Sequence, residues 1–336
     1  MFSLQTDADL SRANTLGLAA RAGLLCVLHD PARLPELLAH PQLAGLPRRV
    51  LGGGSNLVMG RELPGVTIKL ENRGRRLLDE QDDAVLLAVA GGENWHELVL
   101  WTLAQGWPGL ENLALIPGSV GAAPIQNIGA YGLELKDRFH HLIARSLDDG
   151  SQRRFDLAQC RFGYRDSVFK HEEAGRWLIE EVVLQLPKRW QPKLDYGDLR
   201  ARLGTAEPTA QAVAEAVMAV RRSKLPDPAV LGNAGSFFHN PVVSAEEHAR
   251  LHVLFPDLIA YPLPDGRFKL AAGWLIERAG WKGRRLGPVG MYSEQALVLV
   301  NHGGADANDV ARLAEAVTAD VLARFGVRLT PEPVWW

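Results

Sequence analysis

The chain has 336 residues, of which 47% are hydrophobic and 23% are charged, and its formal net charge at pH 7 is -2. This composition is typical of a globular protein and excludes disordered and fibrous classes. The near-neutral charge provides no overall field that would attract nucleic acid or an anionic membrane, so we expect neither as a partner.

The chain is longer than a single hydrophobic core usually supports, so we expect two or three subdomains. Its first third alternates short strand-like runs with helical ones, which indicates an α/β or α+β fold. The strand-like runs occupy residues 22–28, 48–60, 66–70 and 84–90, and the helical runs occupy residues 31–40 and 95–107.

The middle of the chain is rich in strands, and the last third mixes helices with strands. Residues 142–147 and 152–157 flank an Asp-Asp-Gly turn, which predicts a hairpin. A helical run at 210–225 ends at a Pro-Asp-Pro breaker, a reasonable domain boundary. Beyond it lie helical runs at 244–255, 270–280 and 307–325 and a strand at 296–301, which predict a separate α+β lobe.

The two cysteines, Cys26 and Cys160, lie far apart and show no CxxC spacing. This pattern argues for a reducing compartment and against a disulfide framework. The N-terminus lacks the basic and apolar regions of a signal peptide, and no run approaches the roughly 18 apolar residues of a membrane helix. We therefore expect a cytoplasmic protein.

Two glycine-rich loops, residues 51–56 and 116–132, are the strongest candidates for a binding function. Glycine allows backbone N–H groups to approach a phosphate closely, although both loops could equally be structural turns. The first loop lacks the third glycine of the dinucleotide fingerprint, and no Gly-Lys pair exists to form a P-loop. Taken together, the two loops suggest an extended cofactor held without a Rossmann motif.

The histidines and serines match no metal or hydrolase template. Neither His96 nor His171, each followed by glutamate, has the second histidine of the HExxH motif. His140 and His141 are adjacent, so on a strand they are expected to point to opposite faces. No serine stands in a GxSxG motif. We expect no metal site.

Three further residues have ordinary structural interpretations when each is taken alone. Ser236 follows a glycine, where a serine usually hydrogen-bonds its own backbone in a turn. Arg165 precedes Asp166, with which it could pair on a hairpin. Glu332 lies between two prolines near the C-terminus, where a solvated carboxylate is usual.

Long motifs nevertheless make the chain similar to the UDP-N-acetylenolpyruvoylglucosamine reductases, a family of flavoenzymes. The resemblance runs in the family's order from Asn14-Thr15 to Glu332. The stretch RWQPKLDYGDLR around Tyr196 resembles the branch of the family that has a substrate-covering tyrosine loop. The motifs that carry the resemblance occupy residues 108–135, 160–171, 225–244, 269–283 and 331–333.

The resemblance implies an α+β protein with the two-lobed FAD-binding fold of the vanillyl-alcohol-oxidase (PCMH) type and a C-terminal α+β substrate-binding domain. It places the first FAD-binding lobe at residues 1–71, joined by the C-terminal segment 327–336. The second lobe then comprises residues 72–222, and the substrate-binding domain comprises residues 223–326.

The resemblance also implies noncovalent FAD, with NADPH as the hydride-donating cosubstrate and a UDP-sugar as the substrate. His239 stands where some relatives have lysine, so the resemblance does not define which contacts this position makes with the nucleotide at the rim of the site. The implied cofactor-binding residues are Gly53, Gly54, Ser55, Asn56, Leu57, Pro117, Gly118, Ser119, Gly121, Gln126, Asn127 and Gly129. The implied substrate-binding residues are Tyr196, Lys224, Asn240, Tyr261, Lys269, Lys282 and Gln295.

The implied reaction reduces UDP-N-acetylglucosamine enolpyruvate to UDP-N-acetylmuramate for peptidoglycan synthesis. Hydride passes from reduced FAD N5 to C3 of the enolpyruvyl group, and Ser236 supplies a proton to C2. Arg165 and a protonated Glu332 stabilise charge on the carboxylate. Two alternatives stay open at this point, namely another FAD-dependent oxidase or dehydrogenase of this fold and a non-catalytic sugar-nucleotide-binding homologue.

Overall fold

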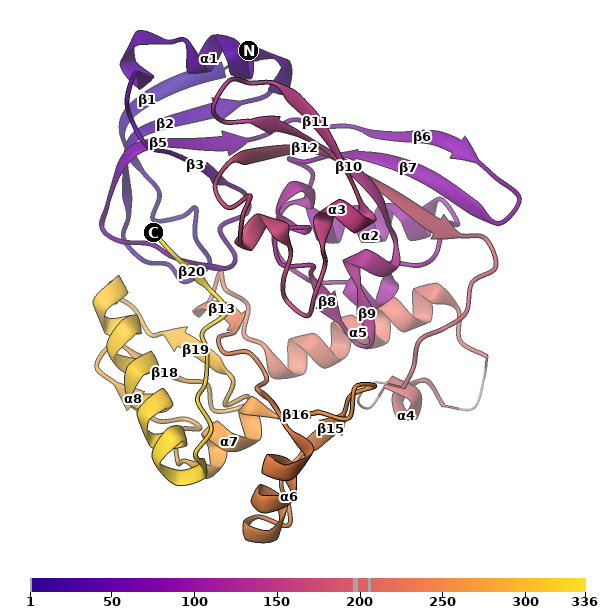
Figure 1. Cartoon of the computed structure of the whole chain (residues 1–336), viewed down its shortest axis with the longest axis vertical. Helices are drawn as coiled ribbons and strands as arrows, with labels where there is room; N and C mark the ends of the chain where they lie inside the picture. The colour runs from indigo at the N-terminus through magenta and orange to yellow at the C-terminus, as the bar shows by residue number, and fades with distance from the viewer. Residues whose placement is uncertain (1, 196–198, 205–206) are drawn as a thin grey trace. The chain divides into compact units, whose positions relative to one another are not determined.

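The computed structural model describes residues 2–195, 199–204 and 207–336 (Figure 1). By internal contacts the chain divides into two compact units. The first unit comprises residues 1–8, 22–53 and 64–221, and the second comprises residues 9–21, 54–63 and 222–336. The three-domain division implied by the sequence stays a prediction.

The first unit begins with a four-stranded sheet in the order β1-β2-β5-β3. Strands β3 and β5 run parallel to each other. Leu24, Cys26 and Leu28 of β2 point inward at every second position, as expected of a strand with one buried face. The elements of this region are β1 (Phe2–Asp9), β2 (Arg21–Leu28), α1 (Leu34–Leu38), β3 (Arg48–Leu51) and β5 (Glu62–Leu70).

A second sheet of the first unit has the order β11-β10-β12-β7-β6. Its β10 and β11 form the predicted antiparallel hairpin, with Leu142 opposite Phe155. Apolar residues of β7, β10 and β12 share one core with helices α2 and α5. The elements are β6 (Arg75–Glu80), β7 (Ala84–Ala90), α2 (Trp95–Ala104), β8 (Gly129–Ala130), β9 (Leu133–Glu134), β10 (Phe139–Ser146), β11 (Gln152–Asp156), α3 (Leu157–Cys160), β12 (Trp177–Pro187), α4 (Leu199–Leu203) and α5 (Ala210–Lys224).

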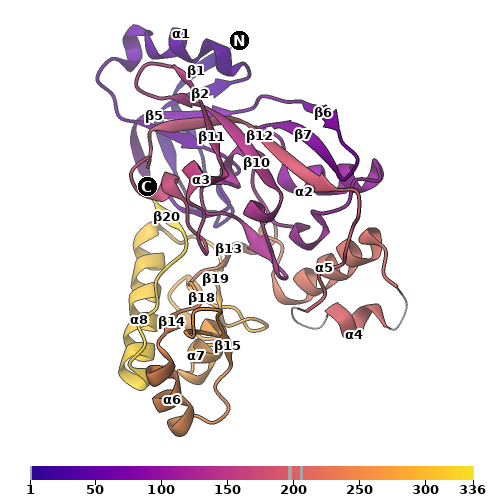
Figure 2. The same cartoon turned by 45° about the vertical axis from the view of Figure 1, so that its right-hand side comes forward.

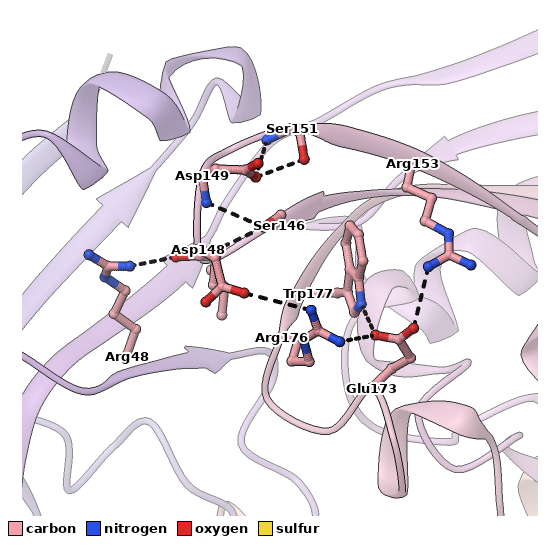
Figure 3. Close-up of polar contacts among 10 residues, drawn as sticks. Arg48, Ser146, Asp148, Asp149, Ser151, Arg153, Glu173, Arg176 and Trp177 are labelled. Atoms are coloured by element: carbon pink, nitrogen blue, oxygen red, sulfur yellow. Dashed lines mark hydrogen bonds and ion pairs between the residues drawn. The ribbon is translucent and has the colours of Figure 1, made fainter.

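A polar network fixes the turn between β10 and β11 (Figure 3). Ser146 Oγ accepts hydrogen bonds from the backbone N–H groups of Asp148 and Asp149. Arg48 on β3 donates to the Leu147 carbonyl at 2.6 Å. Because Arg48 belongs to the first sheet and Leu147 follows the end of β10, this bond ties the four-stranded and the five-stranded sheets together.

The adjacent histidines of β10 do not point to opposite faces. His140 Nδ1 and His141 Nδ1 lie 2.7 Å apart, and the two ring centroids are 4.9 Å apart. The reason is a register shift between Phe139 and His141 in the pairing with β12. Such a bulge interrupts the alternation of the strand and brings neighbouring side chains together. The expectation from strand alternation was therefore wrong at this position.

The second unit contains a four-stranded sheet in the order β13-β19-β18-β17, a three-stranded sheet in the order β14-β16-β15, and a parallel pair of β20 with β4. Helices α7 and α8 share a core with β18 and β19 (Figures 1 and 2). The elements are β4 (Leu57–Val58), β13 (Gly232–Ser236), β14 (Val242–Val243), α6 (Ala245–Leu254), β15 (Ala260–Pro262), β16 (Phe268–Leu270), α7 (Ala272–Arg278), β17 (Arg285–Leu286), β18 (Val289–Met291), β19 (Val298–Asn301), α8 (Ala307–Phe325) and β20 (Val334–Trp335).

The local sequence of helix α8 explains where the helix begins, where it ends and which face it buries. Asp306 caps the N-terminus of the helix, because its side chain accepts a hydrogen bond from the Asp309 N–H. The Asp309 side chain in turn accepts a hydrogen bond from the Asp306 N–H. Gly326, at φ 72°, ends the helix in the left-handed conformation. Between these ends, Val310, Leu313, Ala314, Val317 and Val321 recur at helical spacing and are buried.

Both cysteines are free and buried, each within a different core of the first unit. Burial raises the pKa of the Cys26 thiol and of the Cys160 thiol to about 12, with Asp156 contributing to the second shift. Within the described parts of the chain, no helix has the length and apolar character needed to cross a membrane.

Candidate active site

The C-terminal segment runs beside the chain that follows β13 and thereby brings together the segments that carry two predicted catalytic residues. The Glu332 N–H donates to the Phe237 carbonyl at 2.8 Å, and the His239 N–H donates to the Thr330 carbonyl at 2.9 Å. Phe237 directly follows Ser236 in the chain. Ser236 and Glu332 are 96 positions apart in sequence and are held by the same short ladder of backbone hydrogen bonds.

The position of Ser236 differs from the turn that the sequence alone indicated for it. It is the last residue of β13 and lies opposite Val298, rather than in a self-bonded turn. Gly235 before it has φ 70°, a conformation that strains other residues, and a Cβ atom there would meet open space. Phe237 and Phe238 are buried with ring centroids 5.2 Å apart. Among the described residues, the Ser236 hydroxyl has no hydrogen-bond partner.

Glu332 is not a solvated carboxylate, because its side chain is only 10% exposed. Its Oε1 lies 3.7 Å from Nδ1 of His239, whose side chain is 20% exposed. Asn56 Nδ2 donates to the Glu332 carbonyl at 3.3 Å, and the Asn56 carbonyl accepts from the Val334 N–H. The sequence motifs marked His239 only as a variable rim position. Its proximity to Glu332 depends on strand register, for which the sequence carries no local signal.

The described substrate-side predictions all fall in the second unit. Tyr261 and Lys269 lie directly opposite each other on β15 and β16, so their side chains share a face of that sheet. Asn240 Oδ1 accepts from the Ala272 N–H at 2.9 Å, which orients this amide at the start of α7. Tyr196 lies outside the described residues.

The other three predicted substrate residues have these positions. Lys282 Nζ donates to Glu277 Oε1 at 3.0 Å, and Gln295 Oε1 accepts from the Leu297 N–H at 3.3 Å. Lys224 is the last residue of α5 and is exposed. The Lys282–Glu277 pair is an exposed ion pair of the kind that contributes little to stability.

Within the first unit, the two glycine-rich loops pack directly against each other. A Cβ atom at Gly53 would lie 2.6 Å from the Gly118 Cα, and one at Gly52 would lie 2.8 Å from Ser119 Oγ. A Cβ atom at Gly121 would likewise lie 2.6 Å from the Ile179 carbonyl oxygen. Larger residues therefore cannot replace these glycines without displacing backbone or side-chain atoms.

The same loops offer donors suited to a pyrophosphate. Gly118 has φ 121°, and no hydrogen bond among the described residues uses the backbone N–H of Gly118 or of Ser119. Consecutive backbone N–H groups of this kind form an anion-binding concavity. The residues present therefore fit the FAD that the motifs imply. Ser55, Asn56 and Leu57 of the first loop, together with Gly54, belong to the second unit.

Asn127 has a structural role inside its loop. Its side chain is fully buried, and its Nδ2 donates to the Gly163 carbonyl at 2.9 Å and to Glu134 Oε2 at 3.1 Å. Its Oδ1 accepts from the Lys136 N–H at 3.0 Å. The amide thus joins the second glycine-rich loop to the hairpin that carries Arg165. Its contact with a cofactor stays a prediction.

Arg165 is held in an unusual backbone conformation in the first unit. Its φ is 54°, in the left-handed region. Its Nη2 donates to the Gly129 carbonyl at 2.7 Å, and its own carbonyl accepts from Lys170 Nζ at 3.0 Å. Asp166 instead contacts His171 Nε2 at 2.8 Å. Arg165 and the Ser236–Glu332 pair belong to different units.

No group of three or more histidine, cysteine or carboxylate side chains that could hold a metal ion occurs in the described ranges.

Two family models match the chain. An FAD binding domain matches residues 24–155, and the C-terminal domain of UDP-N-acetylenolpyruvoylglucosamine reductase matches residues 227–336. Together with the paired glycine-rich loops, these matches define an FAD-binding flavoprotein with a C-terminal α+β domain, as predicted.

Relatives at high identity give the particular family. The chain is 58% identical to the UDP-N-acetylenolpyruvoylglucosamine reductase of Azoarcus sp., over 99% of this chain and 98% of that protein. It is 54% identical to the Pseudomonas aeruginosa reductase, over 98% of each. The chain therefore belongs to the UDP-N-acetylenolpyruvoylglucosamine reductase family. The crystal structure of the Thermus caldophilus reductase shares the fold, with a TM-score of 0.69 and 24% identity over 100% of this chain and 99% of that one.

The close packing of the two loops predicts that Gly53→Ala loses most of its bound FAD. The added methyl group would lie 2.6 Å from backbone at Gly118 and would force the loops apart. The measurement is flavin absorbance relative to protein absorbance after purification. Gly106→Ala is the matched control, because Gly106 has φ 76° but open space around a Cβ atom. Equal FAD content in the two variants would contradict the importance of this packing.

Proposed function

We propose that this protein reduces the enolpyruvyl ether of UDP-N-acetylglucosamine enolpyruvate to the lactyl ether of UDP-N-acetylmuramate, a peptidoglycan precursor. FAD, when bound, supplies hydride chemistry to the reaction, with NADPH as the reductant. The observation that carries the proposal is the ladder that holds Ser236 beside the segment of Glu332, in a chain whose full-length relatives are named for this activity.

Ser236 donates a proton to C2 of the substrate in this proposal. The hydroxyl has no hydrogen-bond partner among the described residues, so no protein bond must break before it acts. A serine is a weak acid, but the carbon that gains electron density at C2 is a strong base. The buried rings of Phe237 and Phe238 next to it limit the access of water.

Arg165 and Glu332 act on the substrate carboxylate, where negative charge increases during the reaction. A guanidinium offers a planar pair of donors that matches a carboxylate, and Glu332 in its protonated form offers one further donor. A carboxyl group that is mostly buried beside another carboxylate favours its neutral form. The low exposure of Glu332 supports this role.

The substrate-side residues provide local positive charge and an aromatic surface for the UDP group. Lys269 with Tyr261 on one sheet face, Lys224 and Lys282 are suited to a diphosphate, because the chain as a whole carries a net charge of -2. Tyr196, Asn240 and Gln295 complete the proposed set. We also propose that the protein acts in the cytoplasm, which the two buried free thiols support.

The decisive test of this function uses rapid mixing of the purified holoenzyme. NADPH is expected to bleach the flavin, and UDP-N-acetylglucosamine enolpyruvate is expected to restore its absorbance much faster than oxygen does. Bleaching followed by reoxidation that the UDP-sugar does not accelerate would favour a different FAD oxidase or dehydrogenase. A protein that neither bleaches nor turns over would be a non-catalytic binding homologue.

Ser236→Ala is expected to leave flavin reduction by NADPH unchanged and to slow reoxidation by the enolpyruvyl substrate roughly 10²- to 10⁴-fold, the usual range for a lost general acid. Ser236→Cys should recover part of the rate, because a thiol also carries a proton. Rapid-mixing absorbance separates the two half-reactions. Equal slowing of both would mean that the hydroxyl is structural.

Glu332→Gln is expected to retain more of the substrate half-reaction than Glu332→Ala or Glu332→Asp. An amide still donates a hydrogen bond at nearly the same reach, whereas alanine has no donor and aspartate is one methylene shorter. The rate of reoxidation by the enolpyruvyl substrate is compared among the three variants at equal FAD content. Identical rates would rule out a donor role for this side chain.

A further inference from the structure

The start of helix α2 holds the chain where it enters the second glycine-rich loop. The Trp95 N–H donates to the Gly118 carbonyl at 3.0 Å, and the Val120 N–H donates to the Glu93 carbonyl at 2.9 Å. The indole Nε1 of Trp95 donates to the Leu113 carbonyl at 3.1 Å. The path of the loop therefore depends on its bonds to the first turn of α2.

His96, in the same turn of α2, adds a contact that no predicted function has used. Its Nδ1 accepts a hydrogen bond from the Leu115 N–H at 3.1 Å. Leu115 has φ 57°, in the left-handed region, where a leucine is strained because its Cβ atom crowds the following carbonyl oxygen. Both side chains are half-buried. The bond to His96 therefore stabilises a backbone conformation that leucine ordinarily avoids.

The loss of this bond would affect the donors that suit the pyrophosphate. Leu115 lies three residues before Gly118 and four before Ser119, so a change in its φ redirects the chain that carries both N–H groups. Consecutive N–H groups bind an anion only while they face one concavity. A partly buried Leu115 N–H without an acceptor would also be unfavourable. Both effects shift the loop toward conformations that bind FAD less tightly.

We propose that His96 is a positioning residue for FAD, because its neutral imidazole holds Leu115 in the left-handed conformation and thereby aims the N–H groups of Gly118 and Ser119 at the pyrophosphate. The imidazole carries its proton on Nε2 in this role, since an imidazolium has no acceptor for the Leu115 N–H. His96 acts through the backbone and needs no contact with FAD. This inference deepens the proposed function and rests on it, because FAD is the cofactor of the proposed reaction.

The test measures the release of FAD from purified holoenzyme after dilution, followed by the rise in flavin fluorescence. His96→Leu is expected to release FAD about 5- to 30-fold faster than the wild type does, the usual effect of leaving a partly buried donor unpaired. His96→Asn should release FAD at nearly the wild-type rate, because its amide oxygen lies close to the position of Nδ1. His96→Gln is the matched control, because its longer side chain places the amide oxygen near the position of Nε2, and it should behave like His96→Leu.

A double-mutant comparison ties the effect to Leu115. Leu115→Gly removes the strain, because glycine adopts the left-handed conformation readily. In the His96→Leu protein this change is expected to slow FAD release part of the way back to the wild-type rate. In the wild-type protein it should have little effect. Such non-additivity is expected of two residues that act on one conformation.

Wild-type rates of FAD release in His96→Leu and His96→Gln would overturn the inference and leave the proposed function intact. A His96→Asn protein as impaired as His96→Gln would also overturn it, as would additive effects of His96→Leu and Leu115→Gly. If His96→Leu fails to fold or to hold FAD, the comparison of the asparagine and glutamine variants decides the question. Wild-type protein that does not bind FAD would overturn the proposed function together with the inference.

Discussion

The backbone hydrogen bond from Glu332 to the Phe237 carbonyl is the constraint on which the candidate active site depends. It fixes the register between the end of the chain and the strand that carries Ser236, and the isolated bridge between Phe238 and Pro331 extends the same register. Because these bonds join main-chain atoms, they place the two side chains without involving them. The Ser236 hydroxyl and the Glu332 carboxyl group therefore take no part in these backbone bonds.

Much of the secondary structure could be predicted from local pattern, and two of the strands that were missed, β1 and β6, share a physical cause. Helix α8 and the β10–β11 hairpin follow from helical spacing and from an Asp-Asp-Gly turn. Strands β1 and β6 gave no clear signal, because they are edge strands whose residues are mostly exposed. Hydrophobic alternation requires one buried face, and an exposed edge lacks one.

In the candidate site, too, some features follow from the local sequence and others depend on contacts between distant parts of the chain. The glycine-rich loops could be recognised, since close backbone approach restricts both to small residues. The burial of Glu332 and its proximity to His239 could not, because they follow from pairing between residues about a hundred positions apart.

At Arg165, the backbone conformation favours a residue without a bulky side chain, whereas the proposed function needs a guanidinium group. A side chain at φ 54° costs roughly 1–2 kcal/mol relative to glycine, and Lys170 and Gly129 help to hold the chain there. Selection for thermal stability alone would favour glycine or asparagine at this position, whereas the carboxylate binding that we propose for Arg165 requires arginine. Variants of this protein chosen only for heat resistance would therefore tend to lose the guanidinium, and activity must be selected alongside stability to keep it.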